Sequence, residues 1–283
     1  MSILKRNYYC LVAGLPDLFF NEFKQEFNSL KFRNQLKHEL DPLDFKLVEY
    51  LFLEFDNANL LNILYNQNKI FNCHAIYPKR EIENKIDLQE GLPLYIVDFL
   101  KWRKEQDSKE FDLKAENKLH TLFYEYVLQV KNDFLRNWFQ FELNTKNLIT
   151  AINCNKFNYQ TESQIILIES NIAVNTLLIN NRLKHELFDE ELPFSEQIFR
   201  VFESDLSLIE KEKALDKIKW NYLDENTFFH YFTIEKILSY VIKLIIAERW
   251  LKLDAKTGRV LLDKLIEELR TSYEFPAEFS LVK

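Results

Sequence analysis

Glycine is almost absent from this sequence: its 283 residues include three glycines, together with six prolines. An average protein is about 7% glycine, and glycine supplies the positive φ angles that tight hairpin turns and phosphate-binding loops need. So few glycines exclude most sheets built from many hairpins and most glycine-rich nucleotide sites. We therefore expect an all-α protein, with helix over more than about 65% of its residues, well above the average of globular proteins.

Cysteine is scarce as well. Cys10, Cys73 and Cys154 are odd in number, lie far apart and form no Cys-x-x-Cys pair. This pattern predicts neither a disulfide framework nor a zinc site, and a reducing cytoplasm suits it best. Residues 1–9 carry too short an apolar run for a signal peptide.

Long uncharged hydrophobic runs are also missing. The most apolar window of the chain, residues 234–253, contains six charged side chains. Such a density of charge excludes a helix that spans lipid. We therefore expect no direct membrane insertion.

Aromatic and acidic side chains, by contrast, are plentiful. Aromatic residues make up 15% of the chain, hydrophobic residues 47%, and the formal net charge is −7. This much apolar surface argues against disorder, and the acidic balance argues against a nucleic-acid partner, which needs cationic charge to displace counterions. Residues 186–225 alone hold twelve acidic and five basic residues, so 5 − 12 = −7. A solvated helix face and an acidic patch for a basic partner both fit this stretch.

Signals for catalysis are weak. His38 and His185 are each followed by Glu, but neither has the second His four residues later that a zinc-protease helix requires. The run Asp189-Glu190-Glu191 has the chemistry to hold Mg²⁺, yet it lies just before Pro193, where a solvated loop is the favoured interpretation. The sequence also lacks a Gly-x-Ser-x-Gly elbow. We therefore predict no catalytic residue, no metal, no cofactor and no small-molecule substrate, although scattered residues can still assemble an active site.

Local patterns place several elements in the first third of the chain. Residues 8–13 are apolar and rich in β-formers, which is typical of a buried strand or an extended arm. Asp41-Pro42 is a helix-start signal, and the spacing of apolar residues after it predicts one helix over about 42–67. Residues 78–93 are polar and bracketed by prolines, which predicts a connection with one short helix.

Further along, the clearest amphipathic pattern runs from His120 to Leu143 and predicts one long helix. Two long helices, at about 233–253 and 258–272, are predicted to close the chain. An internal echo relates the segment 59–64 to the segment 147–152, an offset of 147 − 59 = 88 residues. Both duplication and chance explain an echo of this size.

Three blocks of the sequence resemble a known family. They are the segment Tyr8–Leu18, the pair of motifs Phe55–Leu61 and Leu92–Tyr95, and the carboxy-terminal set that comprises Phe232–Tyr240, Glu248–Leu251 and Lys256–Gly258. Together they resemble an uncharacterised bacterial family that is encoded beside V-type ATPase genes. That family looks like a divergent form of the C-type stalk subunit of V/A-type ATPases, which is the d-type subunit of eukaryotic enzymes. The likeness covers nearly the whole chain, but the chain is shorter than the C-type subunit and has no Arg at the turn after Asn62 or Thr150.

The resemblance implies a fold and a partner set. The C-type subunit is a funnel of three similar helical bundles, so we expect a single elongated domain with approximate repeats at 20–100, 101–190 and 191–283, preceded by a short extended segment. The implied function is that of a non-catalytic central-stalk subunit, a socket between the membrane rotor ring and the axle subunits of a V/A-type ATPase. The implied location is cytoplasmic, at the inner face of the cell membrane and held there through the ATPase complex.

Tyr240, Glu248 and Arg249 are the family-like positions that the resemblance assigns to partner binding. Glu248 and Lys252 also have the spacing of an i,i+4 surface pair. Two other functions stay open: a generic all-helical scaffold or adaptor outside any ATPase, and an all-helical enzyme whose carboxylate cluster holds Mg²⁺.

Overall fold

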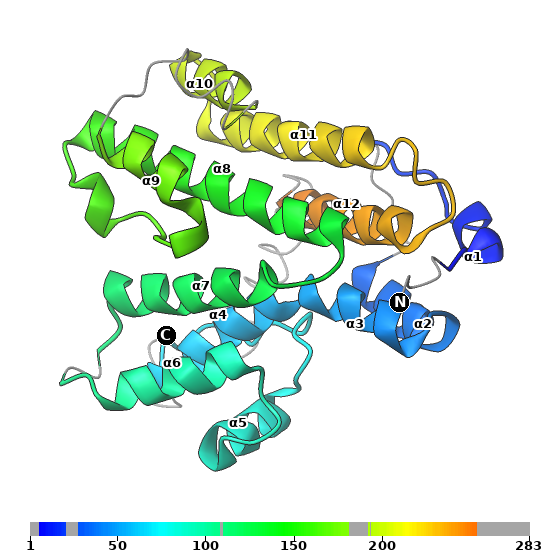
Figure 1. The fold of residues 1–283 in the computed structure, drawn as a ribbon, viewed down its shortest axis with the longest axis horizontal. Coiled ribbons are helices and arrows are strands. Elements are labelled where there is room, and N and C mark those ends of the chain that lie inside the picture. Colours follow the sequence, from blue (N-terminus) through cyan, green and yellow to red (C-terminus); the bar gives the residue numbers. More distant parts are fainter. Residues whose placement is uncertain (1–5, 21–27, 108–109, 181–191, 193, 254–283) are drawn as a thin grey trace, which may run out of the picture.

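The computed structural model describes residues 6–20, 28–107, 110–180, 192 and 194–253. In these ranges about 70% of the chain is helical, in twelve α-helices and two short 3-10 turns, and no strand is formed. The all-α prediction is therefore confirmed. The long helices lie in roughly parallel rows, with α11 at one side of the molecule and α6 towards the other (Figure 1).

The amino-terminal segment differs from its prediction. Residues 9–13 form a short helix, α1 (Tyr9–Ala13), and neither a strand nor an extended arm. The backbone N–H of Val12 donates to Tyr8 O at 3.0 Å, and that of Gly14 donates to Cys10 O at 3.1 Å. Because the segment has no partner strand in the described chain, local helical bonds satisfy its backbone and override the β-preference of its side chains.

The helix predicted over 42–67 is two helices. They are preceded by α2, and the three span Ser29–Glu39 (α2), Pro42–Tyr50 (α3) and Leu53–Leu64 (α4). The predicted start is confirmed, since the Asp41 carboxylate accepts a bond from Leu43 N at 3.0 Å. The break falls at Leu51 and Phe52, whose N–H groups bond to carbonyls three residues back, and both side chains are buried there. A tight turn thus lets consecutive apolar residues enter the core.

The middle of the chain contains four helices, at Lys79–Leu88 (α5), Leu94–Lys104 (α6), Leu113–Val127 (α7) and Asp133–Phe157 (α8). The short helix predicted within 78–93 is confirmed by α5. The single helix predicted from His120 to Leu143 is wrong: α7 ends at Val127, and Asn132 caps a new helix by accepting a bond from Leu135 N at 2.9 Å. The chain reverses in between, so that α8 returns beside α7 (Figure 1).

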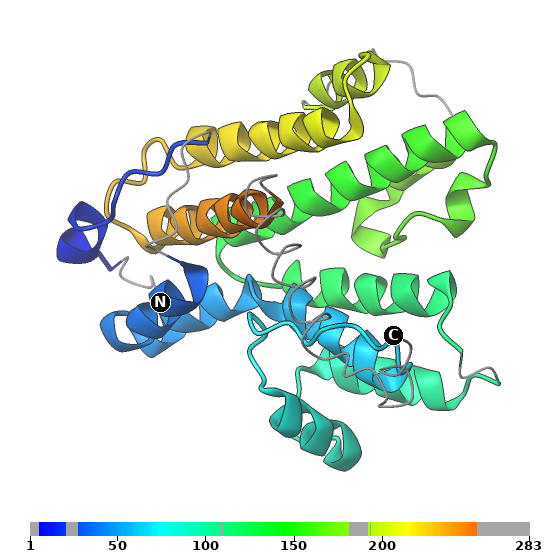
Figure 2. The same ribbon diagram turned by 180° about the vertical axis from the view of Figure 1, so that it is seen from behind.

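The rest of the described chain forms η1 (Thr161–Ser163), η2 (Glu169–Asn171), α9 (Ile172–Ile179), α10 (Ser195–Glu203), α11 (Leu208–Asn226) and α12 (Ile234–Leu253). α12 confirms the helix predicted at 233–253, whereas the one predicted at 258–272 lies outside the described residues. α12 contacts α2, α3, α8 and α11, and it runs through the middle of the molecule (Figure 2). A large core surrounds it, and a smaller core joins α8, α9, α10 and α11.

The two segments of the internal echo make the same backbone contact. Asn59 in α4 donates to Asn72 O at 2.9 Å and accepts from Asn72 N at 2.8 Å. Asn147 in α8 donates to Ile166 O at 2.8 Å and accepts from Ile166 N at 2.9 Å. Each buried amide thus clamps the segment that follows its own helix. Asn59 and Asn147, which lie 88 residues apart, therefore have the same structural role.

Candidate functional site

Two of the family-like blocks meet at one end of the molecule. Tyr8 N donates to Phe232 O at 2.7 Å, and the rings of Tyr9 and Phe232 lie 4.8 Å apart. Tyr240, in α12, donates its hydroxyl to Pro16 O at 3.0 Å. Tyr240 therefore fixes the amino-terminal segment on α12, a contact within the chain.

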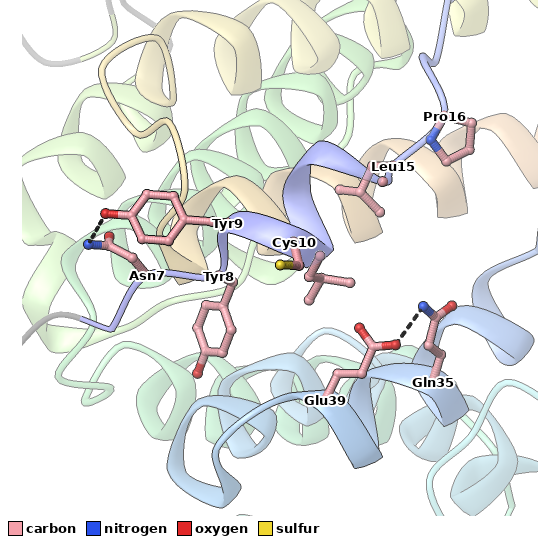
Figure 3. A pocket seen from close by; sticks show the side chains of 10 residues that line it. Asn7, Tyr8, Tyr9, Cys10, Leu15, Pro16, Gln35 and Glu39 are labelled. Carbon is pink, nitrogen blue, oxygen red and sulfur yellow. Dashed lines mark hydrogen bonds between the residues drawn. The ribbon is translucent and has the colours of Figure 1, made fainter.

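A groove opens between α1 and α2 at this end (Figure 3). Its volume is about 620 Å³. Among the described residues that line it, Glu39 alone carries a charge, and its Oε1 accepts a bond from Gln35 Nε2 at 2.9 Å. We call this surface the α1 groove; its lining consists of Asn7, Tyr8, Tyr9, Cys10, Leu11, Gly14, Leu15, Pro16, Gln35 and Glu39.

Large rings lie exposed on α1 and in the turn that packs against it. The turn between α11 and α12 carries Phe228, Phe229 and Tyr231, and together with Tyr9 these side chains are between 57% and 80% exposed. We call these four residues the aromatic end. It was not predicted from the sequence, although the run Phe228–Phe232 after a helix was a signal that could have found it. The rings of Phe228 and Phe229 lie 5.0 Å apart, and exposed apolar patches mark interaction sites.

The opposite end of α11 also exposes apolar side chains. Leu208 is 77% exposed and Ile209 70%, and Leu206 is exposed as well. Ser207 caps this end of the helix: its hydroxyl accepts a bond from Glu210 N, and the Glu210 carboxylate accepts one from Ser207 N. We call Leu206, Leu208 and Ile209 the aliphatic end. Since α11 has 19 residues, it separates the two ends by about 28 Å.

Glu248, the second family-like residue, forms its hydrogen bonds with other residues of this chain. Its Oε2 accepts a bond from Ser29 Oγ at 2.7 Å and lies 3.0 Å from His74 Nε2, while its Oε1 accepts from Ser29 N. Burial alone would raise the pKa of Glu248, but the bonds from His74 and Ser29 outweigh it and hold the pKa below its usual value. Glu248 therefore ties α12 to α2 and to the segment before α5.

Arg249 lies beside it and faces α11. Its guanidinium pairs with Asp216, and Trp250 Nε1 donates to the same carboxylate at 2.7 Å. The Asp216 side chain is 3% exposed, whereas that of Arg249 is 46% exposed. The buried carboxylate of Asp216 thus has both an ion-pair partner and a hydrogen-bond donor, and part of the Arg249 side chain reaches solvent.

A second ion pair joins α11 to α8. Lys219 Nζ lies 3.0 Å from both carboxylate oxygens of Glu142, and both side chains are largely buried. Burial acts to lower the pKa of Lys219, but the carboxylates of Glu142 and Asp216 raise it overall, so the ammonium stays charged. The pairs around Glu142, Asp216 and Glu248 together form what we call the charge network.

The charge network lines a cavity of about 600 Å³ between α4, α8, α11 and α12. Local sequence patterns do not predict this gathering of ionisable groups, since its pairs join distant parts of the chain: His74 and Glu248 are 174 residues apart. Among the described residues, no group of three or more His, Cys, Asp or Glu side chains has the arrangement of a metal site. The candidate Mg²⁺ cluster Asp189-Glu190-Glu191 lies outside the described residues.

No helix within the described ranges is both long and apolar enough to cross a membrane.

A family model described as a protein of unknown function, DUF2764, matches residues 5–272. Neither a curated protein nor a solved structure matches this sequence.

Proposed function

This chain belongs to the DUF2764 family, and we propose that it is a non-catalytic central-stalk subunit of a V/A-type ATPase, a socket that couples the membrane rotor ring to the central axle. The observation that carries the proposal is the pair of exposed apolar surfaces, the aromatic end and the aliphatic end, at the two ends of α11. A coupling subunit must hold two partners at once and keep them at a constant separation. A single helix with a docking surface at each end meets that need.

Rigidity between the two ends supports the proposal. Along α11, Asp216 pairs with Arg249, Lys219 with Glu142 and Asp224 with Lys243. These bonds tie the helix to both α8 and α12. Because a close-packed interior barely compresses, torque applied at one end reaches the other.

The repeat plan of the C-type subunit receives partial support from the two asparagine clamps. Asn59 and Asn147 make equivalent contacts at an offset of 88 residues, close to the spacing expected between the repeats at 20–100 and 101–190. The proposal includes a third unit over 191–283 and a funnel-like arrangement of the three. It also includes a place at the inner face of the cell membrane, held by the ATPase complex.

Copurification tests the proposal. The tagged full-length chain is expressed in its own organism and recovered from detergent-solubilised membranes, and the proteins bound to it are identified by mass spectrometry. We expect axle and rotor-ring subunits of a V/A-type ATPase, in amounts comparable to the bait. Recovery of the chain by itself would contradict the proposal and favour a scaffold or adaptor outside any ATPase.

A second candidate function is the binding of a charged small molecule in the cavity of the charge network. Its ionisable lining favours this function, although Glu142, Asp216 and Glu248 are each already paired with a side chain of the protein. A thermal-shift screen with divalent metals and nucleotides tests it. A ligand-dependent rise in melting temperature that is lost in Lys219→Met would favour this function over the stalk.

A further inference from the structure

The α1 groove and the aromatic end share Tyr9. Tyr9 belongs to both, because its backbone lies in α1 and its ring packs on Phe232 in the turn after α11. The bond from Tyr8 N to Phe232 O fixes the two segments against each other. A partner that covers Tyr9 therefore contacts both the groove and the turn that carries the other three rings.

The groove combines apolar walls with one negative charge. Leu11, Leu15 and Pro16 line it from the side of α1, and Glu39 lines it from α2. Figure 3 shows Cys10 and Glu39 on these opposite walls. Glu39 is the last residue of α2, where the carbonyl end of the helix adds negative potential. The groove thus favours a partner segment in which a cationic side chain is flanked by apolar side chains.

The shape and charge of this surface favour a protein helix over a lipid surface. A groove of about 620 Å³ admits one segment of chain, and each exposed phenylalanine offers a large area for burial. Glu39 lines the groove, and Asp17, next to the lining residue Pro16, is exposed. Both carboxylates would repel anionic lipid headgroups.

We infer that the α1 groove and the aromatic end receive one helical segment of the axle subunit, with apolar side chains against Phe229 and a lysine or arginine over Glu39. The inference rests on the proposed function and adds to it which end of the molecule holds the axle. The aliphatic end is then left for the rotor ring. Among the rings, Phe229 is the most exposed at 80%, so it has the most area to bury.

The three cysteines of the chain provide a chemical probe of this contact. Cys10 is exposed in the groove, Cys73 is exposed outside the lining, and Cys154 is buried. We expect purified axle subunit to slow alkylation of Cys10 by maleimide about tenfold and to leave Cys73 unchanged, as read by mass spectrometry of the full-length chain. Equal rates at Cys10 with and without the axle subunit would overturn the inference.

Matched substitutions test the same contact by affinity. Phe229→Ser should weaken binding to the purified axle subunit by about tenfold or more, as expected of a central aromatic anchor, and Glu39→Lys should weaken it less. The controls are Phe157→Ser, an exposed ring at the end of α8, and Asp87→Lys, an exposed carboxylate on α5. Both controls should bind like the wild type. Wild-type affinity in Phe229→Ser would overturn the inference.

The two proposals fail in different ways. If the wild-type chain copurifies with ATPase subunits but Phe229→Ser and Phe157→Ser bind the axle equally well, the inference is wrong and the stalk function stands. If the wild-type chain recovers no ATPase subunit from membranes, the stalk function is wrong and this inference falls with it.

Discussion

The charge network and the aromatic end invert the usual placement of side chains. Glu142, Lys219 and Asp216 lie largely buried between helices, whereas Phe228 and Phe229 stand in solvent on a turn. Buried charges are tolerated only when they are paired and hydrogen-bonded. Exposed rings need no partner within the folded chain, and their burial becomes favourable only when another surface covers them.

The difference indicates which region serves the fold and which serves a partner. Each carboxylate of the charge network already has a partner on another helix, so the network holds α8, α11 and α12 in one arrangement. The rings of the aromatic end leave most of their surface uncovered. Substitutions should therefore act on stability in the first region and on binding in the second.

The largest effect is expected from Lys219→Met. It leaves the Glu142 carboxylate buried without its cation, which should lower the free energy of unfolding by about 3 kcal/mol, measured by urea denaturation at pH 7. The control Lys213→Met changes an exposed lysine on the same helix and should stay within about 0.5 kcal/mol of the wild type. A similar small value for both variants would show that the pair does not hold the helices together.

Glu248→Gln should cost about 1–2 kcal/mol at pH 7, because it removes the charge from a bond network with His74 and Ser29. The pKa of Glu248 is lowered by folding, so its contribution is complete above the usual carboxyl value near 4.5 and is lost as the pH falls through its lower folded-state pKa. The stability gap between the variant and the wild type should therefore close in acid. A gap that is constant from pH 7 to pH 3 would contradict this account.

Asp56 gives a pH-dependent effect on stability with the opposite sign. It is buried and accepts bonds from Ile76 N and Tyr77 N, and burial raises its pKa from 3.8 to about 6. The folded state thus binds a proton that the unfolded state releases, and the contribution of Asp56 to stability should rise as the pH falls from 7 towards 4. In Asp56→Asn this rise, about 2 kcal/mol for a shift of about two pKa units, should vanish. The pH dependence of urea midpoints measures it.

The smallest effect on folding is expected from Phe229→Ser. Its ring contacts solvent over most of its area, so the free energy of unfolding should change by less than about 0.5 kcal/mol. A thermal melt compared with Phe157→Ser provides the measurement. A loss of several kcal/mol in Phe229→Ser alone would mean that the aromatic end serves the fold, and the contrast with the charge network would disappear.

Local signals were sufficient for much of the fold. The helix start at Asp41-Pro42, the short helix between the two prolines and the helix over 233–253 all follow from caps, breakers and periodicity within a few residues. The breaks at Leu51 and near Asn132 were missed because apolar spacing continues across both. A tight turn and a side-chain cap decide these breaks, and neither disturbs the apolar pattern.

The amino-acid composition and the spacing of apolar residues were enough to determine that the protein is all-α. Scarce glycine and a 3.6-residue apolar repeat act within a few residues and do not depend on distant neighbours. Which charges and rings lie inside was settled only by tertiary packing. Phe52 is fully buried and Phe229 is 80% exposed, yet both follow helices and both have apolar or aromatic neighbours. Burial depends on what the rest of the chain places against a side chain, and residues as far apart as Ser29 and Glu248 meet only when the helices assemble.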